Sequence, residues 1–359
     1  MKLPFYVPMA MKCHLKKITV RLNGLSFAWV HIPEASSQVQ RNLSDNGGMS
    51  DAHFLPSPQL QYVDCPAQPG MGVAEHRMGV WTWGNTSNPG DHVVVCVHGL
   101  TRQGRDFDVL ARQLLARQAG ITVLCPDVVG RGSSDWLSNP LGYQIPVYVG
   151  DMLHWLSQRH ACHPIRRLDW VGTSMGGLIG LILAAQPAQT RPFPLNRLVL
   201  NDVGPSLPWP FVERLRQYVG QPLVVANAQE GAQALREISV GFGPHTDEEW
   251  LALSAPMFRQ LPQGGVGLHY DPGIGEPIRQ LTEKTYAQGE ALLWSLYDQI
   301  SCPTLLLRGV ESDVLTAETA RAMTQRGPRA HCLAFEQVGH APTLVNPTQV
   351  LPVIDWLLA

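Results

Sequence analysis

Short apolar segments rich in β-branched residues alternate with longer segments of helical periodicity from Leu60 to the end of the chain. This alternation is typical of a mostly parallel sheet with helices packed on both faces. We therefore predict an α/β fold built on an eight-stranded, mostly parallel sheet. The predicted strands are residues 60–63, 78–83, 92–97, 121–125, 167–171, 197–201, 304–308 and 332–336.

About a hundred residues separate the predicted strand that ends at Asn201 from the next one, which begins at Thr304, and this is too long for a single crossover. We predict an inserted helical cap over residues 205–290, whose many aromatic side chains wall an apolar pocket. Its predicted helices are residues 210–218, 228–239 and 247–261, and the last follows a capping box formed by Thr246 and Glu249.

The first 48 residues differ from the rest of the chain. They contain no acidic residue before Glu34, and a stretch rich in Ser, Gln, Asn and Gly follows, which is typical of a linker. We predict a poorly structured extension over 1–48, with Met49 as an alternative translation start, and a core in two parts, 49–204 and 291–359. No long apolar block of a secretory signal follows the basic residues of this extension.

Composition narrows the classes of partner and compartment. The formal net charge is −2, so no overall positive field attracts nucleic acid or an anionic membrane. The longest apolar stretch is much shorter than a membrane-spanning helix requires. Seven cysteines are scattered without a short repeated spacing, which argues against a disulfide framework or a zinc site. We expect a soluble, cytoplasmic protein that acts on a small molecule.

The chemistry is indicated by the motif Gly172-Thr173-Ser174-Met175-Gly176, which stands between a predicted strand and an apolar helix. A serine at such a sharp corner needs small neighbours, because the turn is strained and the backbone approaches itself closely. The helix amides behind it point at the place where negative charge develops. We predict that Ser174 is a nucleophile; the alternative is a purely structural turn.

A serine nucleophile needs a base and an orienting acid. His340 follows the last predicted strand, at the carboxyl edge where Ser174 also emerges. Asp313 follows the preceding strand, and the order serine, acid, histidine fits a serine of this kind. Asp202 ends the strand before that and is the alternative acid, whereas Glu311 is a minor rival. We predict Ser174, Asp313 and His340 as the catalytic residues.

The loop His98-Gly99-Leu100-Thr101 follows a buried strand and is expected to form the oxyanion hole. Its donors are the backbone amides of Leu100 and Met175, and His98 is interpreted as a residue that shapes the loop. Arg102 follows directly, and its guanidinium is a candidate contact for a substrate carboxylate. The alternative is that Arg102 is solvated or pairs with a nearby aspartate.

Together these motifs resemble the α/β-hydrolase superfamily, in the subgroup with a helical cap, over residues 60–359. The segment from Pro126 to Asp135 is also similar to the P-D-x-x-G-x-G-x-S-D segment of that family. Related dehalogenases and epoxide hydrolases carry an aspartate where this chain has Ser174. The residues from Asn201 to Pro205 resemble those of esterase-like bacterial members more than those of carbon-carbon bond hydrolases.

The resemblance implies a serine hydrolase that cleaves a carboxylic ester through an acyl-enzyme, with no metal or organic cofactor. The substrate classes we expect are small esters, hydroxyalkanoate oligomers and lactones. One alternative is a carbon-carbon bond hydrolase of a dienoic diketone, which uses similar residues. The other is a non-catalytic, ligand-binding member of the same fold.

Overall fold

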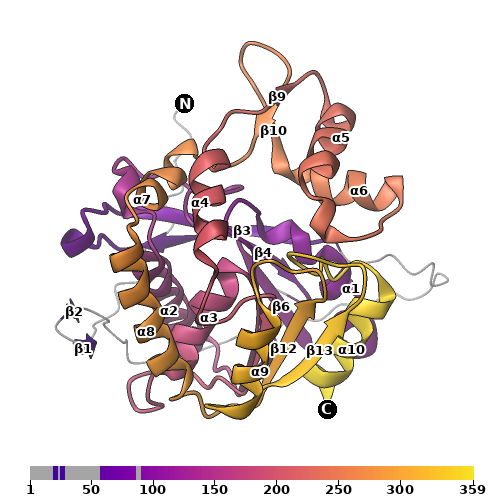
Figure 1. The fold of residues 1–359 in the computed structure, drawn as a ribbon. Coiled ribbons are helices and arrows are strands. Elements are labelled where there is room, and N and C mark those ends of the chain that lie inside the picture. The colour runs from indigo at the N-terminus through magenta and orange to yellow at the C-terminus, as the bar shows by residue number, and fades with distance from the viewer. Residues whose placement is uncertain (1–18, 23–24, 29–56, 86–89) are drawn as a thin grey trace, which may run out of the picture.

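The computed structural model describes residues 19–22, 25–28, 57–85 and 90–359 (Figure 1). Its centre is an eight-stranded sheet in the order β13-β12-β8-β7-β5-β6-β4-β3. Strand β4 runs antiparallel to both of its neighbours, and the other pairs are parallel. The strands are β3 (Gln59–Cys65), β4 (His76–Trp83), β5 (His92–Val97), β6 (Ile121–Pro126), β7 (Arg167–Thr173), β8 (Arg197–Asn201), β12 (Thr304–Gly309) and β13 (His331–Phe335). The predicted sheet is confirmed.

Strand β5 shows why the sheet is buried on both faces. Its side chains alternate between two hydrophobic clusters, with Val93, Val95 and Val97 in one and Val94 and Cys96 in the other. All five are fully buried, as expected for a central parallel strand with helices on either side. The continuous apolar run in the sequence is therefore two interleaved sets of core residues.

Helices cover both faces of the sheet. Helices α1 (Asp108–Arg117) and α10 (Pro347–Leu358) contact each other and contribute to the cluster that contains Val94. The other face is covered by α2 (Ile145–Cys162), α3 (Met175–Ala185), α8 (Glu283–Tyr297) and α9 (Ala317–Gln325). Helix α3 is buried along nearly its whole length, as its apolar sequence predicts. Short 3₁₀ turns occur at Pro69–Met71, Gly104–Phe107, Pro140–Gly142, Val240–Phe242, Ala255–Met257 and Pro272–Ile274.

The segment between β8 and β12 contains helices close to the three that the sequence predicts, together with one further short helix and three short strands that it does not. These are helices α4 (Trp209–Tyr218), α5 (Ala228–Ile238), α6 (Asp247–Ser254) and α7 (Gly275–Arg279) and strands β9 (Val224–Val225), β10 (Phe258–Gln260) and β11 (Val266–Leu268). The three strands form a small antiparallel sheet. In Figure 1, α5, α6 and this sheet stand at the top, above the core. Helix α8 crosses the predicted border at residue 290 and packs on α3.

The predicted helix over 247–261 is too long. Its capping box between Thr246 and Glu249 is confirmed, but the helix ends at Ser254. Pro256 has no N–H to continue the helical ladder, and its ring clashes with the preceding turn. The chain therefore leaves the helix through a 3₁₀ turn and pairs Phe258–Gln260 with β11 as strand β10.

The predicted N-terminal extension lies mostly outside the described residues. Its described part is a pair of antiparallel strands, β1 (Thr19–Leu22) and β2 (Leu25–Ala28), which the sequence analysis did not predict. Within the described ranges, no helix has the length and hydropathy needed to cross a membrane.

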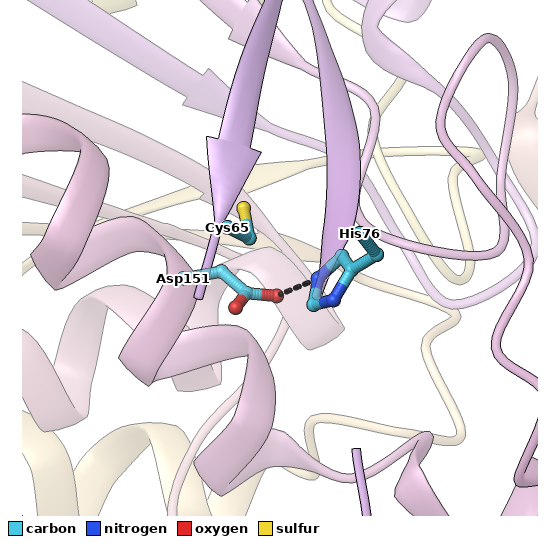
Figure 2. Close-up of side chains that lie close together, drawn as sticks. All are labelled: Cys65, His76 and Asp151. Atoms are coloured by element: carbon cyan, nitrogen blue, oxygen red, sulfur yellow. Dashed lines mark hydrogen bonds and ion pairs between the residues drawn. The ribbon is translucent and has the colours of Figure 1, made fainter. Parts of the chain in front are cut away.

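Three buried side chains meet where the β3–β4 hairpin packs on α2 (Figure 2). Cys65 and His76 are directly paired across the hairpin, and Asp151 comes from α2. The potential metal-ligating atoms of the three lie within 4.8 Å of one another. The His76 Nε2 is 3.0 Å from Asp151 Oδ2, and Gln68 Nε2 donates to Asp151 Oδ1 over 2.8 Å. Both carboxylate oxygens already have partners, so we interpret the group as a structural ion pair.

Both ring nitrogens of His76 face acceptors, because Nδ1 lies 3.0 Å from the carbonyl oxygen of Ala74. A histidine can donate from both nitrogens only when it is protonated. Burial acts to lower the pKa of His76, but the hydrogen bond to Asp151 and the charge of that carboxylate outweigh it and raise the pKa. The ion pair between His76 and Asp151 therefore joins strand β4 to helix α2.

The His76–Asp151 pair predicts a pH-dependent stability. A raised folded-state pKa stabilises the protein fully below the unfolded value and loses this effect as pH rises through the folded value. We expect His76→Gln to lower the free energy of unfolding by about 2 kcal/mol near pH 6 and by less near pH 9. Urea titrations at several pH values measure this, with the exposed His331→Gln as control. A difference that is constant with pH would contradict the charged pair.

Candidate active site

Ser174 occupies the corner between β7 and α3. Its backbone has φ 51° and ψ −114°, a strained conformation for a residue with a side chain. The flanking glycines make this corner sterically feasible: a Cβ on Gly172 would lie 2.2 Å from the Gly176 carbonyl oxygen, and one on Gly176 would lie 2.0 Å from that of Val97. The predicted strand-turn-helix setting of the motif is therefore present.

His340 connects Ser174 to a carboxylate. Its Nε2 lies 3.0 Å from Ser174 Oγ, and its Nδ1 lies 2.8 Å from Asp202 Oδ2. The three residues come from loops at the carboxyl ends of β7, β13 and β8, which the parallel sheet brings to one edge. The geometry is that of a hydroxyl next to a base whose ring is oriented by an acid.

Asp202 is fully buried and its carboxylate is held from three sides. Besides His340, the Gly309 amide donates to Oδ1 over 3.0 Å and the Ser312 hydroxyl donates to Oδ2 over 2.5 Å. The backbone of Asp202 has φ 54°. These bonds fix the orientation of the carboxylate. Sequence reasoning missed Ser312, because a serine in a loop carries no signal of its own.

The structure corrects the predicted acid. Asp313 does not reach His340; its carboxylate forms an ion pair with Arg214 of α4, at 2.6 Å, and its side chain is 56% exposed. The neighbouring Ser312 points inward instead and binds Asp202. The turn after β12 therefore delivers a supporting hydroxyl to the site, and the alternative acid, Asp202, occupies the position beside the imidazole.

Asn201, the residue before Asp202, ties the nucleophile loop to the histidine loop. Its Nδ2 donates to the Thr173 hydroxyl over 3.0 Å and to the Pro342 carbonyl over 2.8 Å. The Ser174 amide in turn donates to the Asn201 carbonyl. One buried amide side chain thus fixes the spacing between the two loops that carry Ser174 and His340.

The loop after β5 lies beside Ser174, where an oxyanion hole is required. A Cβ on Gly99 would be 3.8 Å from the Ser174 Cβ. The Gly99 carbonyl accepts hydrogen bonds from Arg102 N and, over 2.7 Å, from His98 Nδ1. Because this carbonyl shares a peptide plane with the Leu100 amide, both bonds fix the direction of that amide. Met175 begins α3, so its own amide has no partner within the helix.

His98 shapes this loop, as predicted from the sequence. The ring is fully buried, and its Nε2 accepts a hydrogen bond from the Val128 amide over 2.9 Å. Burial lowers the pKa of His98 to about 3, so the ring is neutral and donates only from Nδ1. It joins the loops after β5 and β6, and among the described residues its ring forms no hydrogen bond with Ser174, Asp202 or His340.

Arg102 does not present a free guanidinium to a substrate. It forms two hydrogen bonds to Asp106, of 2.7 and 2.6 Å, and a third of 3.0 Å to the Leu253 carbonyl in α6. The predicted contact with a substrate carboxylate is therefore corrected in favour of the alternative, a pairing with a nearby aspartate. The fork-like geometry of arginine matches the carboxylate already beside it, and the side chain joins the core to the cap.

The inserted segment also contacts the histidine loop. The Phe211 ring of α4 packs edge-on against the His340 ring, with centroids 5.7 Å apart. The Gly339 amide donates to the Gly241 carbonyl over 2.7 Å, and His245 Nε2 lies 2.7 Å from the Thr343 hydroxyl. Phe211, Gly241 and His245 of the inserted segment thus contact the loop that holds His340.

Comparison with known proteins identifies this arrangement. The family model described as the alpha/beta hydrolase family matches residues 94–353. The chain belongs to this family. It is 43% identical to the 3-hydroxybutyrate-oligomer hydrolase of Cupriavidus necator over 298 residues, which cover 82% of this chain and 96% of that protein. The predicted α/β-hydrolase fold and hydrolase class are confirmed.

Two more distant relatives agree with this assignment. The pimeloyl-[acyl-carrier protein] methyl ester esterase of Aeromonas salmonicida is 22% identical over 74% of this chain and 94% of its own length. The crystal structure of an α/β-hydrolase from Novosphingobium aromaticivorans superposes with a TM-score of 0.68 at 32% identity, covering 84% of this chain and 98% of that chain.

Assigning the acid to Asp202 or to Asp313 leads to opposite expectations for one pair of variants. Asp202→Asn presents the wrong hydrogen-bonding partner to the imidazole, and we expect kcat to fall by up to about 10⁴-fold with a folded protein. Asp313→Asn removes only an exposed ion pair, so we expect no more than about a twofold change. Ester hydrolysis and circular dichroism of both variants test this. A large loss in Asp313→Asn alone would restore the original assignment.

Proposed function

We propose that the chain is a serine hydrolase that cleaves the ester bonds of 3-hydroxybutyrate oligomers. The observation that carries the substrate class is the 43% identity to a 3-hydroxybutyrate-oligomer hydrolase along nearly the whole of that protein. The reaction type is supported by the hydrogen-bonded series Asp202, His340 and Ser174. We assign these three residues as acid, base and nucleophile.

The first half of the reaction forms an acyl-enzyme. His340 Nε2 takes the proton of Ser174 as Oγ attacks the ester carbonyl carbon, and Asp202 stabilises the resulting imidazolium. The amides of Leu100 and Met175 donate to the oxygen that becomes negative. When the tetrahedral intermediate collapses, the carbon-oxygen bond to the alcohol breaks and His340 donates its proton to the departing oxygen.

The second half consumes one water molecule. His340 removes a proton from water as the water oxygen attacks the acyl carbon, and the same proton returns to Ser174 Oγ when the serine leaves. Each cycle releases one acid and one alcohol, which for an oligomer are both hydroxybutyrate chains. The scheme needs no metal or organic cofactor. A cytoplasmic location and the lack of a nucleic-acid partner remain predictions from composition.

A substrate panel tests the proposed specificity. Purified protein is assayed with hydroxybutyrate dimer and trimer, nitrophenyl butyrate, butyrolactone and a dienoic diketone. We expect the oligomers to give the highest kcat/KM, because the chain is 43% identical to a hydrolase of 3-hydroxybutyrate oligomers. Preferential turnover of the diketone would indicate a carbon-carbon bond hydrolase. Binding without turnover of any compound would indicate a ligand-binding member of the fold.

Ser174→Ala removes the nucleophile while leaving the glycines of the corner unchanged. We expect hydrolysis of every accepted ester to fall by about 10⁵- to 10⁶-fold with little change in KM. Initial rates on freshly purified protein, with circular dichroism as the folding control, measure this effect. Retention of a tenth of the activity would show that another group attacks the ester.

A further inference from the structure

Arg131 is a fully buried arginine next to the oxyanion loop. Its Nε donates to the Leu100 carbonyl over 2.8 Å, and its Nη2 lies 3.6 Å from the Met175 sulfur. Its Nη1 donates to the Val129 carbonyl over 2.7 Å and to the Tyr148 hydroxyl over 3.0 Å. One guanidinium thus contacts both residues whose amides we assign to the oxyanion hole.

The charge of Arg131 has no carboxylate partner among the described residues; its partners are carbonyl, phenol and thioether groups. The guanidinium also lies over the Tyr143 and Tyr148 rings, at 5.7 and 5.0 Å from their centroids. Arginine is always protonated in proteins, and a buried charge without a counterion is costly. A neutral side chain of the same size would avoid this cost.

We propose that Arg131 is a positioning residue for the oxyanion hole, an inference that rests on the proposed serine mechanism. Its guanidinium binds the Leu100 carbonyl oxygen and contacts the Met175 sulfur. These contacts keep the backbone amides of Leu100 and Met175 in a fixed direction as the oxyanion forms. Its positive charge also favours the negatively charged intermediate over the neutral ester. An interaction that is stronger in the transition state lowers the barrier.

The backbone around Arg131 is held by the inserted segment. The Asp271 amide donates to the Gly130 carbonyl over 2.8 Å, and the Gly132 amide donates to the His269 carbonyl over 2.9 Å. These two bonds flank Arg131 on either side, where it pairs with Tyr270. The segment after β11 therefore fixes the loop from which the guanidinium reaches Leu100 and Met175.

Arg131→Met tests the proposal, because methionine fills much of the same space without charge or donors. With nitrophenyl butyrate we expect kcat to fall by about tenfold to a hundredfold, less than or equal to the loss of a direct oxyanion donor, and KM to change by less than about threefold. A boronic acid that forms a tetrahedral adduct with Ser174 should lose affinity by the same factor as kcat/KM. An unreactive amide analogue should bind as it does to the wild type.

Tyr148→Phe is the matched control. It removes a hydrogen bond of the same guanidinium on the side away from Leu100 and Met175, so we expect lower thermal stability but unchanged kcat and boronate affinity. Arg131→Lys keeps the charge but cannot contact both residues at once, and we expect an intermediate loss. If Arg131→Met does not fold, the kcat and boronate affinity of Arg131→Lys test the positioning role instead.

Two results would overturn the role of Arg131. One is a folded Arg131→Met or Arg131→Lys protein with wild-type kcat and boronate affinity; the other is a Tyr148→Phe protein that loses as much kcat as Arg131→Lys. The nitrophenyl ester keeps this test independent of oligomer specificity. A wild-type protein that hydrolyses this ester but not hydroxybutyrate oligomers would refute the substrate class and leave the Arg131 comparison intact.

Discussion

The pair of hydrogen bonds that joins Asp202, His340 and Ser174 is the interaction on which the site depends. It exists because β8, β13 and β7 are parallel and end at one edge of the sheet. Two of the three are also fixed locally: Ser174 by its strained corner, and the Asp202 carboxylate by the amide and hydroxyl of the turn after β12. The sheet supplies the positions, and these local bonds supply the orientation that catalysis requires.

Sequence patterns predicted the central sheet because inner strands such as β5 and β6 are buried on both faces and appear in the sequence as continuous apolar runs. The eight predicted strands agree with the structure to within a few residues at their ends. The inserted segment was predicted less well. Thr246 and Glu249 identified the start of α6, but the short strands β9, β10 and β11 carry too few residues to show a periodicity. Local capping signals are therefore more informative there than hydrophobic patterns.

Ser174 and His340 were predictable as neighbours because each stands in a distinctive local context, whereas the carboxylate beside His340 was not. Asp202 and Asp313 both follow strands that end at the same edge, so the sequence places both within reach of His340. The difference lies in backbone direction: Asp202 adopts a positive φ that keeps its carboxylate inside, while the turn after β12 points Ser312 inward and Asp313 toward Arg214. Side-chain direction in a loop depends on tertiary contacts that a sequence pattern does not show.

Covalent labelling with a fluorophosphonate tests most directly the claim that His340 and Asp202 activate Ser174. The protein is treated with the reagent, digested, and the modified residue is identified by mass spectrometry. We expect one modification, on Ser174, whose rate falls steeply when Asp202 is changed to Asn and is unaffected when Asp313 is changed to Asn. Modification of a different residue, or an unlabelled Ser174 in a protein that still hydrolyses esters, would contradict it.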